Sequence, residues 1–416
     1  MPVQQAPQSP EARPRFFYGY IVAGAALFTM VITYGSYNSF GVFFRPLLSD
    51  FSSTRAMVSG AFSLSWMMQG ALSIVMGRLT DRFGPRAVLT ICGVLVGLGY
   101  LLLSQIGAVW QLYLFYGVMV GVGSSTFVPL TSTVARLFVK RRTVMTGIAT
   151  VGIGLGSLII PLLANKIILA YDWRMSFIVL GIMAFVIVTS AAQFLRKDIT
   201  RFNQFSENNN KSGKESPRLD AGTSSVRKAV RTNQFWMIFV IFFCLGYCGM
   251  AIQVHIVPYA TDINISPSIA ALILSTIGGG SIVGRIVLGN VGDRIGNRQT
   301  YIIGFALMSL TILLLLPLRY AWSFYPVAFI FGMGYGSGIA QESPLVATVF
   351  GLTAHGSIFG MLSLGYTIGA ATGPVVAGYI FDVTTSYQVA FVITAAIGIV
   401  SLTLNLLLKP KISVAL

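Results

Sequence analysis

Long apolar runs separated by short polar segments dominate the chain from residue 17 onward. Runs of about 20 apolar residues are typical of transmembrane helices, because a lipid-exposed backbone must satisfy its own hydrogen bonds. The short alternating segments of a membrane barrel do not occur. The pattern predicts an all-α membrane protein with about twelve transmembrane helices, near residues 17–44, 56–79, 87–106, 109–137, 143–169, 174–195, 234–261, 267–291, 299–317, 321–350, 355–381 and 386–408.

The composition agrees with a lipid environment. Hydrophobic residues make up 55% of the 416 residues and charged residues only 10%, against about 25% charged in soluble domains. Two histidines and twelve acids leave little material for a hydrolytic or metal centre, and the three cysteines all lie in apolar stretches. We therefore expect no enzyme, no metal site and no cofactor.

The net charge of +16 reflects where the cations lie rather than a nucleic-acid partner. Most of the 28 lysines and arginines fall in the tail, the linker and those loops that share one side of the predicted bundle. The positive-inside rule places this side in the cytoplasm. The charge pattern thus predicts a multi-pass protein of the plasma (inner) membrane with both termini cytoplasmic.

The chain divides into two halves that repeat each other. A polar tail (1–15) precedes a six-helix bundle (16–197), and a polar cytoplasmic linker (198–232) leads to a second six-helix bundle (233–410). Four positions of the predicted fourth helix recur in the tenth in the same register: Gly117, Gly121, Gly123 and Pro129 match Gly332, Gly336, Gly338 and Pro344. A duplicated six-helix unit is typical of a rocking transporter that holds its substrate between the halves.

A charged decapeptide also occurs twice in this register, at 77–86 and 289–298. Both copies have the form G-x-x-x-D-R-x-G-x-R and resemble the signature of the major facilitator superfamily. Gly84 and Gly296 allow the tight turn, and the aspartates can cap a helix or pair with arginines. The resemblance implies a cytoplasmic gate made of Asp81, Arg82, Arg86, Asp293, Arg294 and Arg298.

A narrower resemblance lies in the first and fifth helices. Phe138-Val139-Lys140-Arg141-Arg142, followed by Gly147, Ala149 and Gly152, resembles the fifth-helix signature of the monocarboxylate transporters. Phe17-Tyr18-Gly19-Tyr20 resembles a loose form of their first-helix signature, without the usual acid before the glycine. The resemblance implies a bacterial branch of these proton-linked lactate and pyruvate carriers, related to oxalate/formate antiporters.

Arg285 lies inside the predicted eighth helix, eight residues before Asp293. At 1.5 Å per residue it is roughly 12 Å deep, where an arginine costs on the order of 2.5–3.5 kcal/mol. We expect it to face the central cavity, although it could extend to the inner interface or pair with a protein acid. Its planar guanidinium suits a carboxylate. Both families named above carry a substrate-binding arginine at the matching place.

The number of buried cations bears on the substrate. The oxalate exchangers carry a lysine in the eleventh helix, where this chain has Tyr366. A second carboxylate would lack a partner in a low dielectric, so one cation favours a monovalent anion. We expect a small monocarboxylate, with L-lactate or pyruvate favoured, as the partner.

Two acids are candidates for proton coupling. Glu342, in the tenth helix, is either a titrating acid or a fixed counter-ion, and Asp262, at the outer end of the seventh helix, is either a proton site or an ordinary loop residue. Mammalian relatives have an aspartate one turn before the arginine, whereas this chain has Ser281 there.

Further residues are predicted to line the substrate site. Tyr34, Tyr37 and Asn38 share one face of the first helix. His255 could sense protons, bind a substrate hydroxyl or simply join two helices. Three aromatic residues, Phe331, Tyr335 and Phe359, could form an apolar wall around a methyl group.

No nucleotide-binding loop is expected. The glycine runs 278–280 and 152–156 lie within apolar helices, where close helix packing explains them, and the chain has no G-x-x-x-x-G-K-[ST] sequence. The sequence therefore predicts gradient-driven proton symport of a monocarboxylate by alternating access. A carboxylate exchanger and a membrane sensor without transport remain alternatives.

Overall fold

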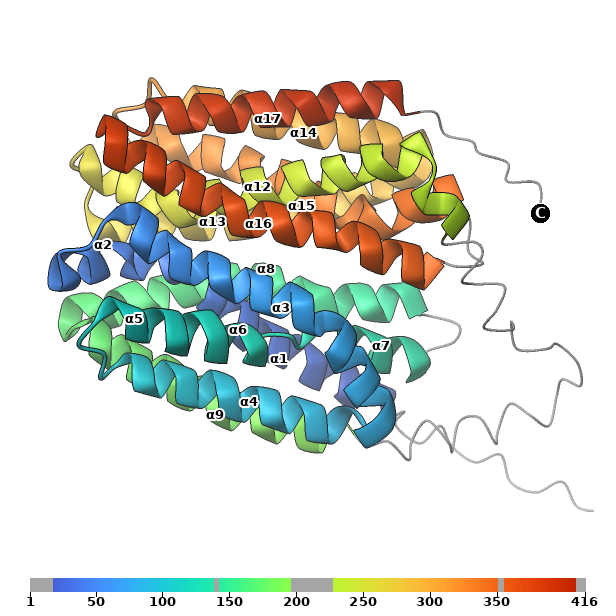
Figure 1. The fold of residues 1–416 in the computed structure, drawn as a ribbon, viewed down its shortest axis with the longest axis horizontal. Helices are drawn as coiled ribbons and strands as arrows, with labels where there is room; N and C mark the ends of the chain where they lie inside the picture. Colours follow the sequence, from blue (N-terminus) through green and yellow to red (C-terminus); the bar gives the residue numbers. More distant parts are fainter. Residues whose placement is uncertain (1–17, 138–141, 196–226, 351–354, 409–416) are drawn as a thin grey trace, which may run out of the picture.

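The computed structural model describes residues 18–137, 142–195, 227–350 and 355–408. Within these ranges the chain is helical, and its helices run roughly parallel to one long axis (Figure 1). The predicted tail and most of the predicted linker lie outside the described residues, as does the cluster Phe138–Arg141 of the fifth-helix signature.

The helices agree with the twelve predicted runs to within a few residues, apart from the first run, which extends to Phe51. In chain order they are α1 (Gly19–Asn38), α2 (Phe40–Phe51), α3 (Arg55–Phe83), α4 (Pro85–Leu103), α5 (Val109–Leu112), η1 (Tyr113–Val120), α6 (Gly121–Gly123), α7 (Phe127–Leu137), α8 (Arg142–Ala170), α9 (Trp173–Gln193), α12 (Asn233–Asp262), α13 (Pro267–Ile295), α14 (Asn297–Leu315), α15 (Ala321–Phe350), α16 (His355–Thr384) and α17 (Gln388–Leu407).

Two of the predicted runs are not single regular helices. The first consists of α1 and α2, which meet at Ser39 and together span Gly19–Phe51. The fourth contains a π-helical segment, η1, and a break before α7. Hydrophobic periodicity marks both runs as apolar but carries no signal for a local change in hydrogen-bond register.

Within the described residues, ten of the runs are long and apolar enough to cross a membrane by themselves. The helices α3, with 29 residues, and α15, with 30 residues, are long enough but are not among the ten. Buried Ser59, Ser65 and Gln69 explain the polarity of α3, and buried Ser337 and Gln341 that of α15. Polar residues are tolerated in a membrane helix when they face the protein interior.

The two halves pack against each other along a few helices. The N-terminal half comprises α1–α9 and the C-terminal half α12–α17, and the seam between them is formed mainly by α8 with α13, α3 with α16 and α2 with α12 (Figure 1). This arrangement confirms the predicted fold of two six-helix bundles.

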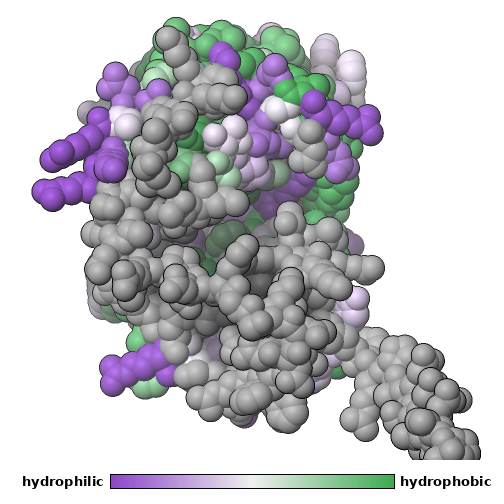
Figure 2. Space-filling view, turned by 90° about the vertical axis from the view of Figure 1, so that its right-hand side faces the viewer, coloured by the Kyte–Doolittle hydropathy of each residue, from purple (hydrophilic) through white to green (hydrophobic). Residues whose placement is uncertain are grey.

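The two ends of the bundle differ in their turns and side chains. At one end, which we call the signature end, Gly84 (φ 86°) and Gly296 (φ 97°) form matching turns with backbone angles that only glycine readily adopts. Figure 2 looks onto this end, where hydrophilic residues lie around the edge and hydrophobic residues are visible beside them. At the opposite end, which we call the Arg55 end, Trp110, Tyr171 and Trp322 are largely exposed. Such aromatic residues mark a membrane–water interface.

Candidate functional site

A small cavity lies between the halves, near the middle of α8 and α13. Its volume is about 20 Å³, room for about one water molecule. It is lined by Asn38, Ile153, Gly154, Ser157, Gln253, Ile277, Gly278, Ser281, Arg285 and Tyr335. The lining comes from α1 and α8 of one half and from α12, α13 and α15 of the other half. A ligand bound here would therefore contact both halves.

Glycine brings α8 and α13 together beside this cavity. A Cβ atom on Gly278 would lie 2.7 Å from the backbone nitrogen of Leu158, closer than any real side chain allows. Gly280 faces the carbonyl of Phe329 on α15 in the same way. The prediction that this glycine run serves helix packing is confirmed.

Arg285 reaches from α13 across the seam. Its Nη1 donates a hydrogen bond of 3.0 Å to the carbonyl of Thr150 on α8. Its Nε is buried and has no hydrogen-bond partner. An arginine donor without a partner in a membrane interior is costly, and a carboxylate placed in the cavity would relieve that cost.

Glu342, on α15, is near this guanidinium. The two groups interact electrostatically but form no ion pair, although both side chains are described. The Oε1 atom of Glu342 is buried without a hydrogen-bond partner. Glu342 is not among the residues that line the cavity, so it is an acid near Arg285 and not part of the cavity wall. Each of the two side chains has a buried polar atom without a hydrogen-bond partner.

Aromatic side chains gather around Tyr335, which lines the cavity. The hydroxyl of Tyr335 is 2.6 Å from that of Tyr366 on α16, and Phe331 stacks on the Tyr335 ring with an interplanar angle of 5°. Trp66, from α3 in the other half, contacts the Tyr366 ring edge-on with centroids 5.6 Å apart. The ring of Tyr335 occupies space that Gly249 on α12 leaves open.

Polar groups also line the cavity. Asn38 donates a hydrogen bond of 2.8 Å from Nδ2 to Oγ of Ser157, and Gln253 of α12 belongs to the same lining. Oγ of Ser281 is buried without a partner. A small ligand with a carboxylate and a second polar substituent would find several hydrogen-bonding groups in this lining.

The two predicted lining tyrosines of α1 lie elsewhere, and Tyr366 and Phe331 contact Tyr335 without lining the cavity themselves. Tyr37 is fully buried in the N-terminal half, where its hydroxyl is 2.5 Å from Oγ of Ser65 and its ring packs against Trp66. Tyr34 packs in the apolar core of the same half, against Phe127. The spacing i, i+3, i+4 defines one broad face of α1, but only Asn38, at its end, reaches the cavity.

His255 and Asp262 lie on α12 toward the Arg55 end, away from the cavity. Nδ1 of His255 is 2.9 Å from the hydroxyl of Tyr387, and Nε2 is 2.8 Å from the carbonyl of Pro374. Because both ring nitrogens are engaged by the protein, His255 joins helices and does not line the site. Asp262 forms an ion pair of 2.7 Å with Arg55.

Phe359 is also outside the cavity lining. It lies on α16 and contacts Phe242 edge-on, with ring centroids 6.5 Å apart. Of the predicted aromatic wall, the structure brings Tyr335 to the cavity and places Phe331 directly behind it.

The predicted gate residues lie at the signature end. Arg298 donates hydrogen bonds to the carbonyls of Asn405 and Leu406 on α17, within its own half. Arg86 and Arg294 are exposed, and Arg82 lies over the ring of Phe83. The side chains of Asp81 and Asp293 are outside the described residues. The contacts of Arg298 join α14 to α17 and do not cross between the halves.

Several residues of the cavity and of the seam between the halves could not be singled out from the sequence. Ser157 gave no signal within an apolar helix. Arg55, Asp382 and Tyr387 were not singled out, although they meet at the seam. For Arg55 and Asp382 the available signal was their position at helix ends beside an outer loop, where charges are ordinary.

Comparisons with known proteins agree with this architecture. The family model described as Major Facilitator Superfamily matches residues 26–260 and 245–414, and the chain belongs to this superfamily. A solved structure described as a bacterial homolog to the human lysosomal transporter Spinster, inward-facing and unoccupied, has a TM-score of 0.74 at 14% identity and covers 95% of this chain and 97% of its own. The protein is a membrane transporter and not an enzyme.

Relatives narrow the class further. Monocarboxylate transporter 13 of Bos taurus is 27% identical over 91% of this chain and 86% of its own length. Monocarboxylate transporter 2 of Homo sapiens is 25% identical over 91% and 83%, and the uncharacterized MFS-type transporter YhjX of Escherichia coli (strain K12) is 25% identical over 81% and 82%. The chain is thus similar to monocarboxylate transporters, as its motifs predict.

Proposed function

We propose that this transporter carries a small monocarboxylate, with L-lactate or pyruvate favoured, and that Arg285 binds the carboxylate. The proposal rests on the surroundings of the Arg285 guanidinium. It lies in the cavity between the halves, and its Nε has no hydrogen-bond partner. A bidentate carboxylate would satisfy it. Tyr335, Tyr366 and Asn38 complete the proposed site, with Phe331 behind Tyr335.

The charge of the lining supports a monovalent substrate. Among the described lining residues, Arg285 is the cation, and the eleventh-helix position that carries lysine in oxalate exchangers is Tyr366, bonded to Tyr335. A second carboxylate would have no cation to meet in this low dielectric. The similarity to monocarboxylate transporters points the same way.

Proton coupling follows from the charge balance of the site. When the carrier is empty, a charged Glu342 offsets Arg285. When a carboxylate pairs with Arg285, a proton on Glu342 keeps the site neutral. Both states then cross the membrane interior without a net buried charge. Asp262 is the second candidate, but its carboxylate is already engaged by Arg55, which favours Glu342.

Alternating access accounts for the size of the cavity. At about 20 Å³ the cavity is too small for a carboxylate substrate, so the halves must part at one end to admit it. By the positive-inside rule we assign the signature end to the cytoplasm and the Arg55 end to the outside.

The test uses the purified protein in liposomes. We expect an inward pH gradient to drive uptake of radiolabelled L-lactate, and Arg285→Ala to abolish it. The control is Arg174→Gln, which removes an exposed arginine paired with Asp50 outside the site. If uptake ignores the pH gradient but requires an internal carboxylate, the protein is an exchanger. If Arg285→Ala transports normally, the site assignment is wrong.

A further inference from the structure

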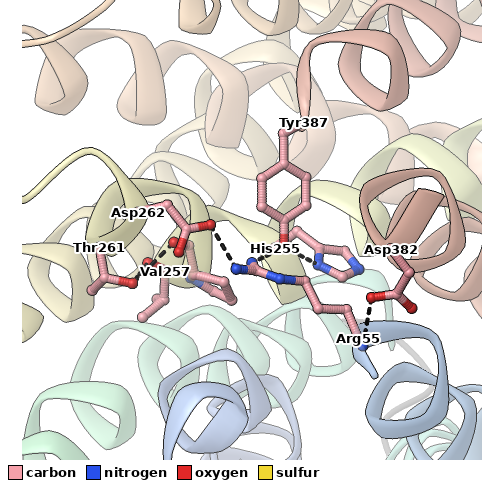
Figure 3. A network of polar contacts seen from close by, with 8 residues as sticks. Arg55, His255, Val257, Thr261, Asp262, Asp382 and Tyr387 are labelled. Carbon is pink, nitrogen blue, oxygen red and sulfur yellow. Dashed lines mark hydrogen bonds and ion pairs between the residues drawn. The ribbon is translucent and has the colours of Figure 1, made fainter. Parts of the chain in front are cut away.

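A polar cluster outside the substrate site joins the two halves at the Arg55 end (Figure 3). Arg55, the first residue of α3, belongs to the N-terminal half. Its partners belong to the C-terminal half: Asp262 ends α12, Asp382 lies near the end of α16, and Tyr387 precedes α17. Three helices of one half therefore converge on a single residue of the other.

Both terminal nitrogens of the Arg55 guanidinium contact the C-terminal half. Nη2 is 2.7 Å from Oδ2 of Asp262, and Nη1 donates a hydrogen bond of 2.6 Å to the hydroxyl of Tyr387. The Phe381 ring lies beneath it, 3.7 Å from Cζ to the centroid. The Arg55 side chain is only 13% exposed, and a charge-assisted contact screened from water is stronger than an ordinary surface pair.

Asp382 supplies a second link through the backbone. Its two carboxylate oxygens accept hydrogen bonds from the backbone N–H groups of Arg55 (2.9 Å) and Ala56 (2.8 Å). These are the first N–H groups of α3, which have no partner inside the helix, and the helix dipole favours an anion there. The C-terminal half thus caps a helix of the N-terminal half.

A second layer fixes Tyr387 in place. His255 contacts its hydroxyl, and the edge of Phe44 from α2 packs on the imidazole at 5.1 Å between centroids. A Cβ atom on Gly378 of α16 would lie 3.0 Å from the backbone of Arg55. The halves are therefore in direct contact behind the polar cluster.

We propose that Arg55, Asp262, Asp382 and Tyr387 form a latch that closes the Arg55 end of the central site. Access to Arg285 from this side then requires the Arg55 side chain to leave Asp262 and Tyr387, and Asp382 to release the start of α3. This proposal assumes that the protein is a transporter of the superfamily and that the two halves meet at the Arg55 end. It does not depend on which substrate is carried.

The test measures the latch without substrate. Spin labels are attached to cysteines at Gln105 and Ser268, which are exposed at the Arg55 end of opposite halves, and the distance between them is measured in lipid nanodiscs. The three native cysteines are buried, so labelling is selective. We expect Arg55→Gln to raise the ratio of separated to closed molecules about ten-fold, as expected for losing a charge-assisted contact.

Charge reversal gives the stronger test. Arg55→Glu places a third carboxylate beside Asp262 and Asp382, and we expect a clear population with separated labels. Adding Asp262→Arg to this variant should restore the closed distance. The matched control is Arg174→Gln, because the Arg174–Asp50 pair lies at the same end but within one half. The proposal is overturned if Arg55→Glu keeps the native distance, or if Arg174→Gln separates the labels equally.

Discussion

Arg55 and Arg285 both lie at the interface between the halves, but the protein surrounds them differently. Arg55 is paired with an aspartate, a tyrosine hydroxyl and an aromatic ring. Arg285 has one hydrogen bond to a backbone carbonyl and a buried Nε without a partner. The first arrangement suits a contact that holds two parts of the protein together. The second suits a group that binds a transported substrate and then releases it.

The largest expected effect tests whether geometry or charge matters at Arg285. Arg285→Ala should lower lactate uptake by about 100-fold or more, because removing one partner of a buried ion pair costs about 3–5 kcal/mol. Arg285→Lys keeps the charge but loses the planar fork, and we expect an intermediate loss of about ten-fold. Initial uptake rates in liposomes measure both. Equal uptake rates for wild type and Arg285→Lys would show that transport does not need the planar, two-pronged geometry of the guanidinium.

The next effect concerns the acid beside Arg285. Glu342→Gln keeps the shape of the side chain but cannot exchange a proton. We expect uptake no longer to respond to a pH gradient, whereas counterflow of labelled against unlabelled lactate continues. The comparison variant is Asp262→Asn, which should retain the response to the gradient. The opposite pattern would assign the proton to Asp262.

A smaller effect is expected at the aromatic wall. Tyr335 lines the cavity, and Tyr335→Phe removes its hydroxyl, which bonds to Tyr366. We expect KM for lactate to rise about 3- to 10-fold, the range for one neutral hydrogen bond. Tyr37→Phe is the matched control, since its hydroxyl bonds to Ser65 inside one half. An equal rise in KM for Tyr37→Phe would mean that the cavity does not define the site.

The smallest effect on transport is expected at the signature end. Arg298→Gln loses its hydrogen bonds to α17, which join helices of the same half. We expect unchanged KM and a melting temperature lower by roughly 2–4 °C, for a loss of about 1 kcal/mol. A change in KM without a change in melting temperature would instead support a role in gating.

The fold could be predicted because its main signals are local or repeated. The length of the apolar runs defines the helices, and the two decapeptides define the turns at Gly84 and Gly296, both of which have positive φ. The π-helical segment at Tyr113–Val120 could not be predicted. It packs against α3 and α4, and no local sequence pattern encodes these contacts.

The site was only partly predictable. The location of Arg285 follows from the cost of burying its charge, which leaves few places for it. Tyr37 was misplaced because helical periodicity gives the face of α1 but not the depth at which that face meets its own bundle or the other half. Whether Arg285, Glu342 and Asp262 have the roles assigned to them stays a prediction.

His255 and Arg55 show a second limit of predicting a structure from its sequence. A histidine in a membrane helix has several possible roles, and its neighbours Tyr387 and Pro374 are more than one hundred residues away along the chain. The partners of Arg55 are equally remote. The contacts of His255 form only when α12 packs against α16 and α17, and those of Arg55 only when the two halves meet, so no local pattern predicts either cluster.

The most direct measurement of the central claim is calorimetric titration of L-lactate into the purified protein, compared among wild type, Arg285→Ala and Arg55→Gln. We predict that Arg285→Ala shows no binding, whereas Arg55→Gln, whose side chain does not line the cavity, keeps its binding heat. Lactate binding to Arg285→Ala with wild-type affinity, in protein that is still folded, would contradict the account.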